Sequence, residues 1–434
     1  MVRPRIGIYG VLEESEEGWE NAGALLATVA EGLQRAGAET RLARDPVSSD
    51  ATALAAAGEL QAQDPDLLLA VIVCWSFDSL SVSILRRLPR PLAILAVPGI
   101  RSGSLVGAHQ LGSLLTELGL PHMVCYGDPA AEETYRPVAA YGRAAAAKRR
   151  LELGRIGNVG RRTPGMTVAS FDEVEITRLF GAQVAMYGWG EIEARAEALD
   201  ADAVAEGRRR MASIGRVSSS KEALDDAARL FLALRGQAQA DGLLALAVGC
   251  YPQHAGRVCL PLGLLGEEGI PAGCEGDMNS TLAMYLLQCF TGRPAHFGEI
   301  LEVDERDNTI VTSHCGCAPP CLAADPRQIE VAPVRLWDRG ACLRFPVTAG
   351  PATLVNLVGR RGTYRLCGVE GEAVATEMVF EGNPGKLCLR LPVRTLLDVI
   401  AEEGFGHHWM MGYGHVVPEL RAYCKLTGVR GVFP

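Results

Sequence analysis

The sequence predicts an α/β protein made of two successive α/β units and a β-rich C-terminal part. Residues 1–150 alternate apolar strands with helices, and the same alternation restarts at about residue 154. The segment 66–74 reads DLLLAVIVC, a continuous apolar run that is typical of a central parallel strand. Between 341 and 393, five short β-type segments are separated by glycine and proline turns, which favours an antiparallel sheet or small barrel. The expected domains are therefore 1–150, 151–325 and 326–434.

Individual elements follow from local signals. The first strand is expected at RIGIYGV, and Gly37 ends the first helix at 21–36. A cluster of hydroxyl residues, Ser218, Ser219 and Ser220, offers N-cap candidates for a long helix. Helices are further predicted at 172–180, 191–212, 220–239, 260–267, 278–287 and 394–403.

Composition and charge narrow the classes of function. With 48% hydrophobic and 21% charged residues and a net charge of -9, the 434-residue chain has the composition of an acidic globular protein. Basic residues are not interleaved with aromatic ones, so nucleic-acid binding is not expected. No apolar run reaches the ~18 residues of a membrane span, and no signal peptide is recognised. We therefore expect a cytoplasmic protein that binds neither nucleic acid nor membrane.

Two loops of the first unit follow predicted strands. Trp75 lies in WSFDS, and Arg101 and Ser102 lie in PGIRSGSLVG. In open α/β sheets, ligands bind beyond the carboxyl ends of the strands, so Trp75 and Arg101 are candidate substrate contacts. A purely packing role for Trp75 is the alternative.

The segment CEGD places Glu275 and Asp277 between a short apolar strand and a predicted helix. In an extended segment these two side chains point the same way and form a candidate site for a hard divalent cation. The alternative is helix capping, because aspartate is a favoured N-cap and a helix N-terminus attracts negative charge. Both interpretations are compatible with each other.

A glycine-rich segment near the C-terminus, GFGHHWMMGYGH, contains His407, His408 and His415. Neutral imidazole is a common ligand of transition metals, so this segment is a second candidate for metal binding. The alternative is a surface turn with incidental histidines.

The chain has thirteen cysteines, and no secretory context supports a disulfide framework. The segment HCGCAPPC places Cys315, Cys317 and Cys321 after His314. The spacing matches neither the Cys-x2-Cys knuckle of zinc sites nor the cysteine pattern that binds the iron–sulfur clusters of ferredoxins. A thiolate metal site or an iron–sulfur cluster at these three cysteines is one interpretation, and a buried strand followed by a proline-containing loop is the other.

These segments together resemble the L-fucose/L-arabinose isomerase superfamily, and in particular its short L-fucose isomerase-like members. The resemblance covers nearly the whole chain, and 269–315 is its most specific part. It implies two Rossmann-like α/β domains followed by a C-terminal antiparallel β-barrel-like domain. It also implies aldose–ketose isomerases that use a divalent metal, usually Mn²⁺. Such isomerases form homo-oligomers, trimers or hexamers, in which a neighbouring subunit completes the site. The segments that carry the resemblance are IGIYG, VCWSFDS, RIGNVGRRTPGM, FGAQV, GIPAGCEGD, SHCG and the HH…GH ending.

The resemblance also implies roles for individual residues. It makes Asp277 and His408 metal ligands, and it places Trp75 near the substrate across a subunit interface. His415, seven residues after His408, is a further candidate for substrate binding. One position departs from the family pattern, because Gln253 stands where a catalytic glutamate ligand is expected. A glutamine amide can coordinate a metal through oxygen but cannot act as a base. Either His254 or Glu275 is the candidate replacement.

The function expected from the sequence is therefore metal-assisted isomerisation of a sugar or related polyol through an enediol. Catalysis is assigned to Asp277, Glu275, Gln253 and His254, with metal held by Asp277, His408 and Gln253. One alternative is an enzyme of another class, such as a lyase or one with an Fe–S or thiolate-metal centre at Cys315, Cys317 and Cys321. The other is a non-catalytic sugar-binding protein.

Overall fold

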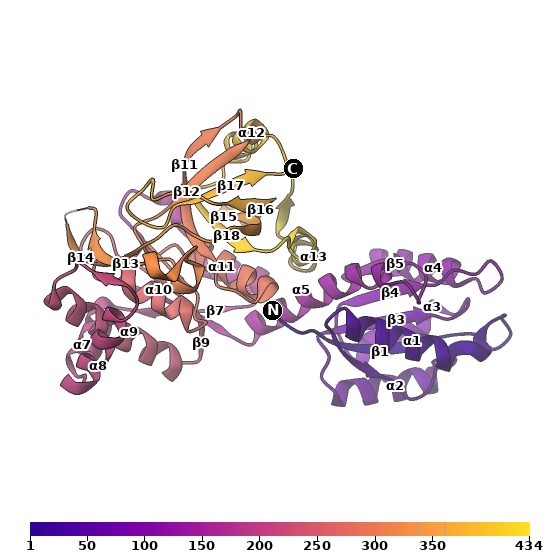
Figure 1. Cartoon of the computed structure of the whole chain (residues 1–434). Coiled ribbons are helices and arrows are strands. Elements are labelled where there is room, and N and C mark those ends of the chain that lie inside the picture. Colours follow the sequence, from indigo (N-terminus) through magenta and orange to yellow (C-terminus); the bar gives the residue numbers. More distant parts are fainter. Residues whose placement is uncertain (337, 361) are drawn as a thin grey trace. The chain divides into compact units, whose positions relative to one another are not determined.

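The computed structural model describes residues 1–336, 338–360 and 362–434. They divide into two compact units (Figure 1). The first unit comprises residues 2–149 and 421–427, and the second comprises Met1, 150–420 and 428–434. The finer division into three domains stays a prediction.

The first unit is built on a five-stranded parallel sheet in the order β2-β1-β3-β4-β5. All six residues of β3 are buried, as expected for a central strand with both faces covered. The strands are β1 (Arg5–Val11), β2 (Glu39–Leu42), β3 (Leu67–Ile72), β4 (Leu92–Ala96) and β5 (His122–Tyr126). The helices are α1 (Ala22–Arg35), α2 (Asp50–Ala62), α3 (Asp78–Arg87), α4 (Ser104–Glu117) and α5 (Arg136–Glu152).

The second unit begins with a smaller parallel sheet in the order β10-β9-β6-β7. This confirms the predicted second α/β arrangement. Its strands are β6 (Arg155–Val159), β7 (Gln183–Tyr187), β9 (Leu243–Val248) and β10 (Ala272–Gly273). Its helices are α6 (Glu173–Phe180), α7 (Trp189–Glu197), α8 (Ala201–Ala212), α9 (Lys221–Ala240), α10 (Cys259–Glu267) and α11 (Met278–Thr291).

One predicted helix is in fact two. The single helix expected at 191–212 is wrong, because α7 ends at Glu197 and α8 starts at Ala201. Asp200 caps α8 by accepting hydrogen bonds from the backbone amides of Asp202 and Ala203. An aspartate in the cap conformation stabilises a new helix start and interrupts an otherwise helical pattern. The expected cap of α9 is confirmed at Ser220, which accepts a hydrogen bond from the amide of Ala223.

The C-terminal part is β-rich, as the sequence predicts. A mixed sheet follows the order β15-β18-β11-β12-β17-β16-β19, with a further pairing between β15 and β16. A separate small sheet has the order β14-β13-β8. A barrel-like closure of the larger sheet stays a prediction. The strands are β8 (Arg216–Val217), β11 (His296–Asp304), β12 (Thr309–Ser313), β13 (Glu330–Val334), β14 (Arg339–Arg344), β15 (Gly350–Arg360), β16 (Thr363–Val374), β17 (Gly385–Leu389), β18 (His408–Tyr413) and β19 (Arg430–Val432), and the helices are α12 (Val393–Glu403) and α13 (Val417–Thr427).

Helix α11 forms the centre of the second unit. Twelve of its fourteen residues are buried, and it contacts β9, β10, β15 and β18. The helix thus packs between the parallel sheet and the mixed sheet, and its N-terminus begins directly after CEGD. Among the described residues, no helix is long and apolar enough to cross a membrane.

The buried His296 on β11 predicts a pH effect on stability. Its Nε2 lies 2.9 Å from the carbonyl oxygen of Asn383, and burial lowers the pKa of His296 from 6.5 to about 4. On acidification the unfolded chain therefore takes up a proton at a higher pH than the folded chain. The contribution of neutral His296 to the free energy of unfolding is fully present above pH 6.5 and is lost as the pH falls from 6.5 to about 4. Between pH 7 and pH 5 this residue should account for a loss of about 2 kcal/mol.

Denaturant unfolding of the wild type and His296→Gln at pH 7 and pH 5 measures this contribution. The glutamine retains a donor for the Asn383 carbonyl but does not titrate. The variant should lose about 2 kcal/mol less than the wild type on acidification. Equal losses in the two proteins would contradict the assignment.

Candidate metal centre

The CEGD loop is fixed by backbone contacts at the carboxyl ends of two strands. The amide of Gly276 donates to Val248 at 2.9 Å, and the amide of Thr163 donates to the carbonyl of Glu275 at 3.1 Å. Gly276 has a φ of 68°, and a Cβ there would lie 2.9 Å from the backbone of Arg161. Glycine is therefore required at this close approach.

Glu275 itself has a φ of 60°, which is unusual for a residue with a side chain. Such a conformation costs about 1–3 kcal/mol and persists where the surroundings impose it, often at a functional site. The side chain of Glu275 is also only 9% exposed. A buried carboxylate held in a strained backbone conformation indicates a functional role.

Asp277 is the N-cap of α11, so the capping interpretation is confirmed. Its Oδ1 accepts a hydrogen bond from the amide of Ser280 at 3.0 Å, and its Oδ2 accepts one from the Ser280 hydroxyl at 2.8 Å. The same Oδ2 lies 2.8 Å from His408 Nδ1. Asp277 therefore joins the start of α11 to the histidine segment.

His408 lies between two carboxylates. Its Nε2 is 3.2 Å from Glu275 Oε2, while its Nδ1 faces Asp277, and its side chain is only 2% exposed. The Asn356 amide fixes this segment by donating to the carbonyls of His408 and Gly406. Burial lowers the pKa of His408, but the hydrogen bonds to the carboxylates raise it more, to about 9. Burial also raises the pKa of Glu275, yet the hydrogen bond to His408 and nearby histidines bring it below its usual value.

A third candidate ligand is a residue that the sequence did not assign to this site. His314 is buried at the end of β12, and one of its ring nitrogens lies within 4.8 Å of ligand atoms of both Glu275 and His408. Burial lowers the pKa of His314 to about 4, so its imidazole is neutral near pH 7, the state that binds metal. Phe297 packs against both histidine rings, at centroid distances of 4.8 and 4.7 Å.

A second group at the same place contains Glu299, His407 and His408, with ligand atoms within 4.8 Å of one another. Glu299 lies opposite His408 in the pairing of β11 with β18. Burial raises the pKa of Glu299, and the negative charge of Glu275 adds to this effect. Glu299 therefore differs from Glu275, because the two carboxyl groups have pKa values displaced in opposite directions.

Gln253 and His254 lie in the turn that follows β9. The Gln253 residue is exposed, and His254 stacks on Trp189 with ring centroids 3.8 Å apart. His254 Nδ1 lies 3.1 Å from Arg257 Nη1 and 3.9 Å from Glu193 Oε1. Within the described residues, no hydrogen bond or ion pair joins Gln253 or His254 to the His408 cluster. Their catalytic roles stay predictions.

The predicted substrate contacts Trp75 and Arg101 belong to the first unit. Trp75 Nε1 donates to Gln110 at 3.1 Å, and Arg101 lies 3.6 Å from Glu17 with 81% of its side chain exposed. His415 follows β18, and its Nε2 lies 3.2 Å from the carbonyl oxygen of Gly371. Their roles toward a substrate stay predictions.

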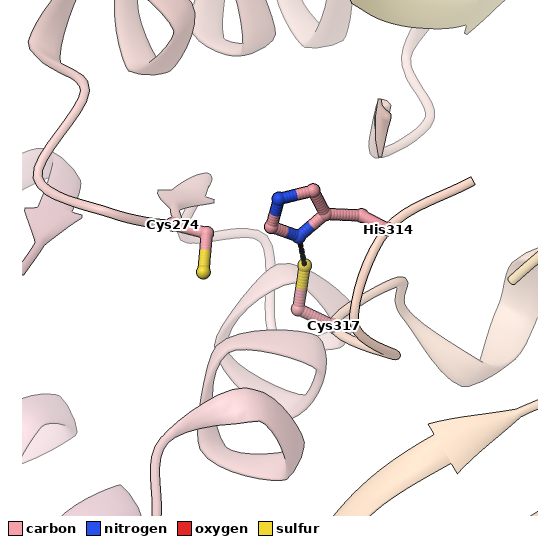
Figure 2. Close-up of side chains that lie close together, drawn as sticks. All are labelled: Cys274, His314 and Cys317. Carbon is pink, nitrogen blue, oxygen red and sulfur yellow. Dashed lines mark hydrogen bonds between the residues drawn. The ribbon is translucent and has the colours of Figure 1, made fainter. Parts of the chain in front are cut away.

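Of the three cysteines proposed for a thiolate or iron–sulfur site, Cys317 belongs to a close group of ligand atoms, and the site at all three stays a prediction. Cys317 lies with Cys274 and His314, whose ligand atoms are all within 4.8 Å of one another (Figure 2). Among the described residues, no group of three such close ligand atoms includes Cys315 or Cys321. The exposed Cys321 instead donates its backbone amide to Glu267 at 2.9 Å.

Sequence patterns alone could not predict several members of these groups of candidate ligands. Glu299 carries no local motif, and His314 was read only as a neighbour of the cysteines. The signal that could have found Cys274 is its position directly before Glu275. Its contact with Cys317, however, depends on how distant loops pack.

The two parallel sheets, the mixed sheet and this buried carboxylate–histidine cluster together define an α/β protein with a candidate centre for a divalent cation. No family model matches the chain. A sulfoquinovose isomerase from Alkalicoccus urumqiensis is 26% identical over 338 residues, which cover 75% of each chain. Another, from Priestia megaterium, is 24% identical over 370 residues and 82% of each chain. An L-arabinose isomerase from Acidothermus cellulolyticus is 23% identical over 439 residues, 92% of this chain and 87% of its own.

These homologues belong to the L-fucose/L-arabinose isomerase superfamily, which confirms the resemblance inferred from the sequence. Among solved structures, a periplasmic solute-binding protein from Actinobacillus succinogenes with bound D-allose aligns with 66% of this chain and 92% of its own. That alignment has 10% identity and a TM-score of 0.18, too low to support an argument.

Proposed function

We propose that this chain is a metal-dependent isomerase that interconverts the aldose and ketose forms of a small sugar or related polyol. The observation that carries the proposal is His408, buried between the carboxylates of Glu275 and Asp277 with His314 beside it. The sulfoquinovose and L-arabinose isomerases, at 23–27% identity, support the reaction type.

The residues present fit a divalent cation. One carboxylate and two imidazoles are oxygen and nitrogen donors suited to a transition metal, and Mn²⁺ is the ion that we propose. Glu275, His314 and His408 would hold it, and His408 would release its Nε2 proton on binding, because a histidine ligand must be neutral. Their ligand atoms already lie within 4.8 Å of one another, and all three residues are buried. The alternative of an iron–sulfur cluster concerns other residues, Cys315, Cys317 and Cys321, and stays a prediction.

Asp277 takes a supporting role in this proposal. Its Oδ2 faces His408 Nδ1, and both of its carboxylate oxygens also bind Ser280 at the start of α11. A carboxylate that accepts a hydrogen bond from one histidine nitrogen fixes the ring, so that the other nitrogen faces the metal. We therefore propose that Asp277 orients His408, where the sequence alone suggested a direct ligand.

Glu275 and Glu299 have different roles in proton transfer in this proposal. Isomerisation moves a proton between C1 and C2 and requires a second group that exchanges protons with the sugar oxygens. A bound divalent cation supplies electrostatic stabilisation of the negative charge that develops on the enediol. The lowered pKa of Glu275 keeps this carboxylate ionised and able to accept a proton from carbon. The raised pKa of Glu299 suits it to hold and return a proton at the oxygens.

In this scheme Glu299 supplies the second carboxyl group that Gln253 lacks. We further propose a cytoplasmic homo-oligomer, a trimer or hexamer, in which Trp75 and Arg101 of a neighbouring subunit contact the substrate. The family resemblance supports this arrangement. His415 is the remaining candidate for a substrate contact.

Variants of the two CEGD acids should weaken Mn²⁺ binding to different extents. Replacing the proposed ligand, Glu275→Gln, should nearly abolish binding, because it removes a charged donor. Asp277→Asn retains a cap for α11 but changes the partner of His408, and such supporting changes cost about 10–100-fold in metal affinity. Isothermal titration with Mn²⁺ measures both.

Glu117→Gln is the matched control, because it makes the same change at an exposed residue of α4 in the first unit and should leave Mn²⁺ affinity unchanged. Wild-type affinity in Glu275→Gln would contradict its role as a ligand. Near-complete loss of binding in Asp277→Asn would instead support direct coordination by Asp277.

Exchange of the C2 proton tests the reaction itself. In D₂O with Mn²⁺, the wild type should incorporate deuterium at C2 of at least one aldose from a panel that includes sulfoquinovose and L-arabinose. Glu299→Gln should lower the rate by about 10²–10⁴-fold and leave Mn²⁺ bound, because it removes a proton-transfer group.

Mass spectrometry or proton NMR follows the exchange. Absence of exchange across the whole panel, with metal bound, would overturn the isomerase proposal. Saturable sugar binding under those conditions would then favour the non-catalytic sugar-binding alternative.

A further inference from the structure

Four buried soft donors lie next to the proposed catalytic centre. Cys250 follows β9, Cys274 precedes Glu275, and Cys317 and His314 lie in the loop that follows β12. Cys250 Sγ is 3.3 Å from Cys274 Sγ, and Cys317 Sγ is 3.9 Å from His314 Nδ1. Figure 2 shows the sulfur of Cys317 pointing at the imidazole, with Cys274 beside them. Each of these four residues is at most 5% exposed.

The spacing of these donors approaches that of a tetrahedral thiolate site. Bonds of ~2.3 Å to sulfur and ~2.0 Å to nitrogen place two sulfurs about 3.8 Å apart, and a sulfur and a nitrogen about 3.5 Å apart. The observed separations of 3.3 and 3.9 Å lie on either side of these values. Small side-chain movements would therefore bring Cys274, Cys317 and His314 around one ion. Cys250, which lies beside Cys274, would have to move further to become the fourth ligand.

The hydrogen bonding of His314 is a second, independent indication. The residue is only 4% exposed, and its Nδ1 has a thiol at 3.9 Å as its partner. A thiol is a weak donor and a weak acceptor, and a buried polar atom with a poor partner is costly. A metal ion bound by Nδ1 and the neighbouring sulfurs would satisfy this nitrogen.

His314 is a member of two ligand groups at once. It joins Cys274 and Cys317 in one and Glu275 and His408 in the other. A neutral imidazole offers one nitrogen to a metal and carries its proton on the other.

We propose that Cys274, Cys317 and His314, completed by Cys250, bind a thiophilic divalent cation of the Zn²⁺ or Cd²⁺ type, and that this ion competes with the catalytic cation for His314. Soft thiolate ligands select such ions, whereas the carboxylate–imidazole group suits Mn²⁺. The competition rests on the proposed function, but the thiolate site itself does not.

Cd²⁺ titration of the Mn²⁺-loaded, fully reduced chain tests both statements. Thiolate-to-cadmium charge transfer in the ultraviolet reports binding to sulfur, and electron paramagnetic resonance reports free Mn²⁺. One equivalent of Cd²⁺ should produce the absorption and release the Mn²⁺. Cys317→Ser should weaken this Cd²⁺ binding by at least about tenfold and retain Mn²⁺ at the same Cd²⁺ concentration.

Two cysteine variants serve as matched controls. Cys367→Ser alters a buried cysteine on β16, and Cys321→Ser alters an exposed one. Both should behave as the wild type. An unchanged signal in Cys321→Ser excludes binding at this exposed thiol as the source of the absorption.

The possible results of the Cd²⁺ titration test the thiolate site and the competition for His314 separately. Absence of thiolate absorption in the wild type, or an undiminished signal in Cys317→Ser, would overturn the thiolate site. Thiolate absorption with Mn²⁺ retained would overturn the competition for His314. A wild type that never binds Mn²⁺ would count against the proposed function, while the absorption would still decide the thiolate site.

Discussion

The buried contact of His408 with two carboxylates is the interaction on which the rest of the second unit depends. Charged groups are costly to bury unless each has a partner, and here Asp277 and Glu275 face opposite nitrogens of one ring. Removing one member leaves a buried charge uncompensated, which typically costs about 3–5 kcal/mol. The cluster of His408, Asp277 and Glu275 therefore constrains both the local fold and the chemistry that this site can perform.

Two distant parts of the chain must meet to build this contact, the CEGD loop with α11 directly after it and the strand β18. The CEGD loop is held at the ends of β6 and β9, α11 begins from Asp277, and β18 supplies His408. Pairing of β18 with β11 then places Glu299 opposite His408. The strained conformation of Glu275 is tolerated because these contacts fix the loop, which is consistent with a carboxylate retained for its function.

Local sequence patterns predicted the elements better than the site. The apolar run at 66–74 and the serine cap of α9 depend on neighbours in sequence, and both were predicted correctly. The break between α7 and α8 was missed, because the cap at Asp200 competes with a helical pattern that continues on both sides. The resemblance identified Asp277 and His408 individually. Their contact spans 131 residues, and no local pattern encodes it.

The assignment of a thiolate or iron–sulfur site to Cys315, Cys317 and Cys321 was based on spacing, and it stays a prediction. The trio Cys315, Cys317 and Cys321 is close in sequence, yet tertiary packing brings Cys317 to Cys274 instead. Glu299 and His314 were not assigned to the carboxylate–histidine cluster, because strand pairing and loop packing bring them to it. The sequence thus located the region of the site, and three-dimensional packing selected its members.

The most direct test of the account is the position of a bound cation. Crystals of the full chain grown with Mn²⁺ and measured at the manganese absorption edge should show an anomalous peak within bonding distance of Glu275 and His408. The carboxylate of Asp277 should remain hydrogen-bonded to His408. A fully bound Mn²⁺ located away from both residues would contradict the central claim.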